Sequence, residues 1–166
     1  VSVANLLFNE NEVMSFDSNF KVNPPLRNEK NRKALIDGLK SGIIDVVVSD
    51  HWPQNIEGKE CEFDVADFGM NTLESTFAML RTATADKIEL NQLIEILTNK
   101  SRDIINIDSP SIKEKELANL TVFQPDEKFE FVLNESLSNS RNIPEINDLK
   151  GKVLAVINNN TVRINQ

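Results

Sequence analysis

Two short motifs carry residue types that could do chemistry: Asn-Pro-Pro-Leu-Arg at residues 23–27 and Ser-Asp-His-Trp-Pro-Gln at residues 49–54. The second motif directly follows an apolar run, so Asp50 and His51 stand where a buried strand would end. In parallel α/β folds the carboxyl ends of the strands open into the site, and a carboxylate there can move protons. The alternative is structural, because an aspartate after a strand also forms turns or caps the next helix.

The chain between these motifs predicts a helix followed by a strand. Apolar residues recur at helical spacing within residues 29–41, and Gly42 can end the helix. Residues 43–48 are mostly β-branched, as expected for a strand that is covered on both faces. A helix followed by a strand fits the repeating unit of a (β/α)8 barrel. Residues 1–8 form another short apolar run, which we expect to be a buried strand.

The rest of the chain predicts short elements. We expect a short helix or turn within residues 9–19, an extended loop at the Pro-Pro pair and a long loop at residues 52–68. Asn71 and Glu74 form a plausible capping pair for a helix that runs through Leu80. Two more helices are predicted at residues 90–97 and 100–105. Strands are predicted at residues 120–123, 129–133, 153–157 and 161–164, with a hairpin turn at 158–160.

The composition is that of an ordinary globular protein, with 40% hydrophobic and 27% charged residues among 166. The net charge of −8 argues against binding to a nucleic-acid backbone, which needs a basic surface. The single cysteine, Cys61, excludes an internal disulfide and suits a reducing cytoplasm. No stretch approaches the length of a membrane span and no signal peptide is visible, so a cytoplasmic location is expected.

The order of the motifs resembles that of the dihydroorotases of the metal-dependent amidohydrolase superfamily. Four motifs occur in the same order as in the family: Lys-Val-Asn-Pro-Pro-Leu-Arg, an Ala-Leu-x-x-Gly-Leu helix, Gly-Ile-Ile-Asp and Ser-Asp-His-x-Pro. Single residues downstream continue the match: Lys59, Phe63, Ala66, Phe68-Gly69 and Leu73-Glu74. Near the end, Ser-Arg-Asn-Ile-Pro at 140–144 and Leu-Lys-Gly-Lys-Val at 149–153 match two more signatures.

The resemblance implies an α/β fold that is the C-terminal portion of a (β/α)8 TIM-like amidohydrolase barrel, followed by part of a small β-sandwich. We divide the chain accordingly into the last βα units of the barrel, residues 1–106, and sandwich strands, residues 107–166. The chain corresponds only to the C-terminal part of the family pattern, so it is expected to be a fragment that needs an upstream half of the same protein.

The resemblance also implies a reaction and its residues. Dihydroorotases interconvert dihydroorotate and N-carbamoyl-aspartate in pyrimidine biosynthesis, with zinc as the cofactor. Asp50 matches the metal-liganding aspartate that also acts as acid and base, and Asn23 matches a substrate-binding asparagine. Phe68 and Gly69 match a backbone contact to the pyrimidine ring, and Gln54 stands where the family has a histidine for the substrate carboxylate. The other metal ligands of the family precede the first residue here, so no zinc is expected on this chain alone.

Several positions depart from the family pattern and leave two hypotheses open. Val-Ala-Asn at residues 3–5 replaces Pro-His-His, Gln54 replaces a histidine, Asn119 replaces an aspartate and Trp52 replaces a small residue. One hypothesis is a zinc-dependent cyclic amidohydrolase acting on dihydroorotate, with a related ring such as hydantoin or allantoin still open. The other is a catalytically degenerate dihydroorotase-like partner subunit of aspartate transcarbamoylase. A homo-oligomer is possible in either case, and neither a nucleic acid nor a membrane is expected as a partner.

Overall fold

A computed structural model describes residues 1–158 and 161–165. The helices, including two 3-10 helices, are α1 (Val3–Leu7), α2 (Glu10–Val13), η1 (Ser18–Phe20), α3 (Glu29–Ser41), α4 (Ile56–Lys59), α5 (Thr76–Thr84), α6 (Leu90–Leu97), α7 (Asn99–Ile104) and η2 (Leu133–Glu135). The strands are β1 (Leu120–Phe129), β2 (Leu149–Asn158) and β3 (Thr161–Ile164). None of the helices described is long and apolar enough to cross a membrane.

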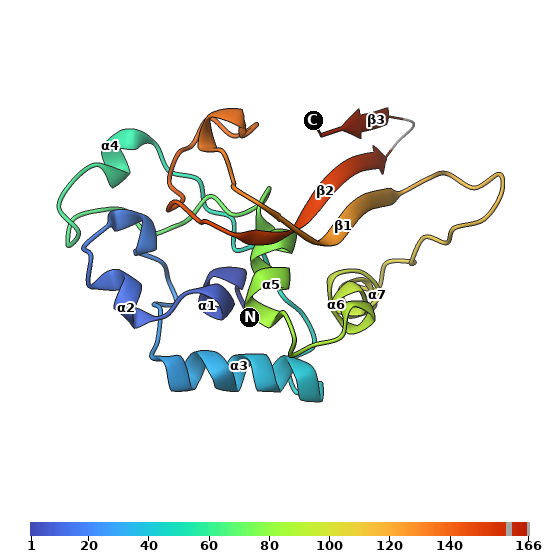
Figure 1. Ribbon diagram of the computed structural model, residues 1–166, viewed down its shortest axis with the longest axis horizontal. Coiled ribbons are helices and arrows are strands. Elements are labelled where there is room, and N and C mark those ends of the chain that lie inside the picture. The colour runs from blue at the N-terminus through green and yellow to red at the C-terminus, as the bar shows by residue number, and fades with distance from the viewer. Residues whose placement is uncertain (159–160, 166) are drawn as a thin grey trace.

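The elements form layers, with the sheet on one side, α3 on the opposite side, and α1 and α5 between them (Figure 1). The core lies where these layers meet, because α1, α3, α5 and α6 turn apolar residues inward. Among its fully buried members are Leu6, Ile36, Leu39, Met70, Met79, Leu80, Leu93, Ile96 and Leu149. The long connection between α7 and β1 extends away from this core (Figure 1).

The predicted helix at residues 29–41 is confirmed as α3, and its ends follow from local chemistry. The side chain of Asn28 accepts a hydrogen bond from the N–H of Asn31 at 3.0 Å and caps the first turn. Gly42 ends the helix in the left-handed region at φ 75°, where a glycine pays no steric cost.

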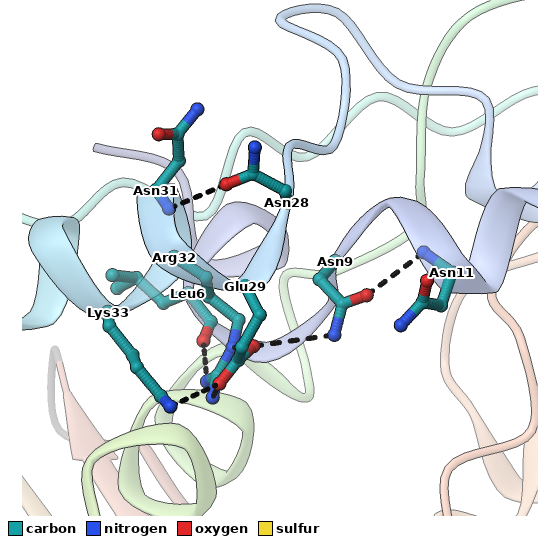
Figure 2. A network of polar contacts seen from close by, with 8 residues as sticks. All are labelled: Leu6, Asn9, Asn11, Asn28, Glu29, Asn31, Arg32 and Lys33. Carbon is teal, nitrogen blue, oxygen red and sulfur yellow. Dashed lines mark hydrogen bonds and ion pairs between the residues drawn. The ribbon is translucent and has the colours of Figure 1, made fainter.

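A polar network fixes α3 against the N-terminal segment (Figure 2). The Arg32 guanidinium bonds the Glu29 carboxylate at 2.6 and 2.7 Å and also donates to the carbonyl of Leu6 at 2.9 Å. The Asn9 amide donates to Glu29 from the loop after α1 at 3.4 Å. The hydrogen bond from Arg32 lowers the pKa of Glu29 to about 2. The network therefore supplies a donor for a carbonyl at the end of α1 while it orients α3.

The predicted strand at residues 1–8 is wrong, because Val3–Leu7 form helix α1. Only the start of this run pairs with residues 43–48: the N–H of Val3 donates to Val48 O at 3.0 Å, and the N–H of Val48 donates to Val1 O at 2.9 Å. A short apolar run does not distinguish a strand from a buried helix, and here the helical alternative buries Val3 and Leu6 completely.

The predicted strand at residues 43–48 is likewise reduced to a single parallel bridge between Ser2 and Val48. It is not covered on both faces, since Ile43 is 81% exposed and Val48 is 49% exposed. A parallel strand needs partners along its length, and the described residues provide one bridge. The proposed barrel portion therefore stays a prediction.

The C-terminal strands form an antiparallel sheet in the order β1-β2-β3. The predicted strands at 120–123, 153–157 and 161–164 are confirmed within these longer strands. The predicted strand at 129–133 is wrong, because β1 ends at Phe129 and η2 begins at Leu133. Of the predicted turn at 158–160, the last two residues lie outside the described part of the chain. The β-sandwich to which this sheet would belong stays a prediction.

The helices between these regions follow the sequence pattern more closely. The predictions at 90–97 and 100–105 are confirmed as α6 and α7, the latter shifted by one residue. The predicted loop at 52–68 contains the single turn α4. The predicted capping pair is wrong, since α5 begins at Thr76 without a side-chain cap, and Asn71 and Glu74 instead bond residues 136–140.

Candidate functional site

The segment Ser49–His51, here called the Asp50 segment, presents an exposed carboxylate from a constrained backbone. Asp50 has a φ of 53°, a conformation that costs a non-glycine residue energy and that persists where the surroundings enforce it. The hydroxyl of Thr72 donates to Ser49 O at 2.7 Å. The N–H groups of Thr72 and Leu73 each donate to Nδ1 of His51 at 3.2 Å. Both neighbours of Asp50 are therefore held by the turn that precedes α5.

The loop that follows Asp50 is bonded to residues far away in the sequence. The N–H of Gln54 lies 3.1 Å from Oδ1 of Asn142, and the Nδ2 group of Asn142 donates to Trp52 O at 3.0 Å. The hydroxyl of Ser140 donates to Gln54 O at 2.7 Å. Asn71 completes the network, because its amide donates to Ser140 O at 2.9 Å and its N–H to Asn142 O at 2.9 Å.

The side chain of Gln54 is brought to Phe68, another predicted site residue. Its Nε2 group donates to Phe68 O at 2.9 Å across the loop that contains α4. Gly69 comes next, with φ 130°, and a Cβ at this position would lie 2.6 Å from Trp52 O. A glycine is therefore required where these two loops meet. The N–H of Gly69 is already bonded to Lys21 O at 3.0 Å.

A buried lysine supports the same loop from beneath. The Nζ atom of Lys59 donates to Asp67 O at 2.9 Å and to Gly69 O at 3.0 Å, and the residue is 5% exposed. Burial lowers the pKa of Lys59 to about 8, although the negative charge of Asp17 acts in the opposite direction.

Two cavities lie beside these loops. A cavity of about 710 Å³ is lined by Gln54, Lys59, Arg141 and Asn142 among others. A second cavity, of about 520 Å³, is lined by Phe68, Phe63, Pro25 and Lys21 among others. The ammonium of Lys21 lies 4.9 Å from the centre of the Phe68 ring, within reach of a cation–π contact.

Three of the predicted site residues line neither cavity. Gly69 is buried, whereas Asn23 and Asp50 are exposed. The loop that carries Asn23 is bonded to Asn5, whose amide donates to Pro24 O at 3.5 Å and to Pro25 O at 3.3 Å. The structure thus joins Gln54 to Phe68 and Gly69, while Asp50 and Asn23 are exposed on two other segments.

Residues 4–157 match the model of the amidohydrolase family. The chain belongs to the amidohydrolase family. The resemblance deduced from the motifs is thereby confirmed as that of a dihydroorotase-like amidohydrolase.

Curated relatives of this amidohydrolase chain are named dihydroorotase. One, from Caldicellulosiruptor saccharolyticus, is 37% identical over 135 residues, which cover 80% of this chain and 31% of the relative. Another, from Bacillus cereus, is 36% identical over 146 residues, which cover 87% of this chain and 34% of the relative. The chain therefore spans about a third of the length of these relatives.

Two solved structures share the fold. A dihydropyrimidinase from Brevibacillus agri superposes with a TM-score of 0.80 at 22% identity, over 98% of this chain and 38% of that one. An L-hydantoinase from Arthrobacter aurescens superposes with a TM-score of 0.83 at 20% identity, over 97% of this chain and 38% of that one. At these identities the likeness establishes the fold alone.

The donor set of this amidohydrolase chain does not make a zinc site by itself. No group of three or more His, Cys, Asp or Glu side chains within the described residues could hold a metal ion. Asp50 offers one exposed carboxylate, and Nδ1 of His51 is occupied by two backbone N–H groups. Zinc takes three or four such ligands, so the remaining ones would have to come from elsewhere.

Sequence reasoning missed the residues that hold the site together. Ser140 and Asn142 were noted only as part of a motif shared with the family, and no role was predicted for Thr72. Their contacts with the Asp50 segment and the loop after it span 21 to 90 residues. The available signal for Ser140 and Asn142 was the short motif Ser-Arg-Asn-Ile-Pro, which does not follow a predicted strand directly. Nothing in the sequence distinguished Thr72.

Proposed function

We propose that this chain forms one wall of the active site of a cyclic amidohydrolase, and that the reaction is the interconversion of dihydroorotate and N-carbamoyl-aspartate in pyrimidine biosynthesis. The names of the curated relatives support the substrate. The similar dihydropyrimidinase and L-hydantoinase support the wider class, since these enzymes also act on cyclic amides. The observation that carries the proposal is the exposed carboxylate of Asp50 on a segment fixed on both sides.

Asp50 is the proton carrier in this proposal. In the hydrolytic direction the oxygen of water attacks the ring carbonyl carbon, the carbon–nitrogen bond breaks and the leaving nitrogen needs a proton. The Asp50 carboxylate accepts the proton that the water loses and delivers it to that nitrogen. Ring closure uses the same proton in reverse. Within the described residues its carboxylate is in no hydrogen bond or ion pair, so it is free for this transfer.

Gln54, Phe68 and Asn23 would bind the ring beside Asp50. The N–H of Gly69 is already bonded to Lys21, so the ring contact falls to the backbone of Phe68, with Gly69 allowing the close approach of the loops. Gln54 fixes Phe68 O through its amide. The amide carries no charge, so the substrate carboxylate would find its charged partner elsewhere.

The proposal is tested by Asp50→Asn in the full-length protein, with zinc supplied and dihydroorotate hydrolysis measured. Loss of a positioned acid–base group should lower kcat by about 10²–10⁴-fold. Asp86→Asn is a matched control, because Asp86 is also an exposed aspartate with positive φ, 63°, and follows α5 instead of preceding it. Turnover by wild type that survives Asp50→Asn would refute the role of Asp50. The 166 residues alone are expected to be inactive.

A catalytically degenerate partner subunit of aspartate transcarbamoylase is the second candidate, favoured by the side chains at two departures from the family pattern. Asn5 stands in place of a family histidine, and its side chain is engaged with Ser2 and with the Pro24 and Pro25 carbonyls. Gln54, in place of another histidine, is engaged with Phe68.

Gln54→His separates the two candidates in the full-length protein. An enzyme should gain affinity for dihydroorotate, because a protonated imidazole adds a charge-assisted contact. A degenerate subunit should show no turnover in either form and should instead co-purify with aspartate transcarbamoylase.

A further inference from the structure

We propose that Thr72 is a positioning residue for Asp50, which it holds through the residues on either side. The inference rests on the proposed function, since it concerns the placement of the carboxylate that would move the proton. No sequence motif singled out Thr72. Its contact with the imidazole of His51 can be tested without measuring any enzymatic activity.

Thr72 contacts the Asp50 segment twice. Its hydroxyl donates to Ser49 O at 2.7 Å, and its N–H donates to His51 Nδ1 at 3.2 Å. Thr72 is completely buried, and the two contacts are partly buried. A backbone bridge between His51 and Met70 adds a further constraint on the same side. The peptide groups around Asp50 are therefore fixed while its side chain stays exposed.

This arrangement explains how Asp50 keeps its left-handed conformation. Aspartate tolerates φ 53° better than most non-glycine residues, and the contacts on both sides of Asp50 stabilise this conformation further. Rotation about φ and ψ of Asp50 would move Ser49 O or the His51 ring, and either movement breaks a bond to Thr72. The direction in which the carboxylate leaves the backbone thus depends on Thr72.

The same contacts fix the tautomer of His51. A backbone N–H can only donate, so Nδ1 must be the unprotonated acceptor, and the neutral ring carries its proton on Nε2. This is the only histidine in the 166 residues. Its ring nitrogens therefore report on the backbone contacts from Thr72 and Leu73, which should loosen when the Thr72 hydroxyl no longer holds the turn against Ser49 O.

Three threonine variants of the full-length protein test the positioning role. Thr72→Val keeps the shape but removes the hydroxyl, and should lower kcat for dihydroorotate about tenfold or more with KM changed less than about twofold. Thr72→Ser restores the donor and should recover kcat to within about threefold of wild type. Thr84→Val is the matched control, because Thr84 is also completely buried and its hydroxyl donates to Leu80 O at 2.7 Å within α5. It should lower thermal stability without changing kcat.

Nitrogen-15 NMR of labelled histidine, at a pH where imidazole is neutral, supplies the second readout. His51→Gln assigns the signals by their disappearance. Wild type, Thr72→Ser and Thr84→Val should show the Nε2–H tautomer, and Thr72→Val a mixture of both. If wild type has no turnover, the proposed function fails, and the spectra alone decide whether Thr72 holds the Asp50 segment. An Nδ1–H tautomer in wild type, unchanged spectra in Thr72→Val, or an unchanged kcat in an active Thr72→Val protein would overturn the positioning role.

Discussion

The buried ammonium of Lys59 should make the stability of the protein rise with pH between about 8 and 10.5. Burial lowers its pKa from 10.5 to about 8, which corresponds to a cost of about 3 kcal/mol for the charged form in the folded state. The unfolded chain holds the proton up to its ordinary pKa, whereas the folded chain releases it near pH 8. The unfolded state thus binds more protons in this window, so raising the pH favours folding. Below pH 8 the full cost is present.

The structure explains why the neutral amine is tolerated. Lys59 has two acceptors, Asp67 O and Gly69 O, and a neutral amine still has two N–H groups to donate. Lys59→Met removes both donors, which costs about 1–3 kcal/mol for each carbonyl left without one, and it also removes the cost of burying the charge. Near pH 7 these effects offset each other, and we expect the free energy of unfolding to change by between a gain of about 1 kcal/mol and a loss of about 3 kcal/mol.

The pH dependence isolates the lysine. Urea unfolding of wild type and Lys59→Met from pH 7 to pH 10 should show wild type gaining about 2–3 kcal/mol relative to the variant. Lys30→Met is the matched control, since Lys30 is exposed on α3 and should leave the pH profile of wild type unchanged. Parallel profiles of wild type and Lys59→Met, within about 0.5 kcal/mol, would refute the reasoning.

Two further predictions concern other contacts. Asn142→Asp replaces the amide that donates to Trp52 O with a carboxylate, which can only accept. Because this loosens Gln54, the variant should raise KM for dihydroorotate about tenfold, with a smaller effect on kcat. An unchanged KM would show that Asn142 is not needed for binding. The Glu29–Arg32 contact stabilises the protein above the ordinary pKa of Glu29, 4.5, and its contribution is lost as the pH falls toward 2. Glu29→Gln should therefore flatten the acid side of the thermal-stability profile, and an equally steep loss in both proteins would contradict this.

The parts of the fold that sequence reasoning predicted well are those determined by local chemistry. Helix α3 has a capping asparagine, a repeated apolar face and a terminal glycine, so its bounds follow from its own residues. The runs at 1–8 and 43–48 have no such signals. Whether they extend depends on neighbours in space, and in the described residues these provide one parallel bridge. The hydrophobic pattern gives no information about such partners.

The candidate site divides in the same way. Gln54, Phe68 and Gly69 were proposed from the resemblance to the family motifs, and in the structure the Gln54 amide donates to Phe68 O while Gly69 lies close to Trp52. The roles assigned to these three residues, and to Asp50 and Asn23, stay predictions, since no bound substrate tests them. Thr72 could not be found, because a buried threonine in a turn has no distinctive neighbours in the sequence.

The contacts of Asn142 bear on the predicted division of the chain at residues 106 and 107. Asn142 and Ser140 belong to the second part, yet they supply partners for the backbone of Trp52 and Gln54 and for Asn71 in the first. If the first part were separated from the second, these buried or half-buried polar groups would lose their partners, and each such loss costs about 1–3 kcal/mol. A loop held in this way does not keep its shape without the segment that holds it. The loop after Asp50 therefore depends on both parts of the chain, whereas the contacts of Thr72 and Leu73 with the Asp50 segment lie within the first part.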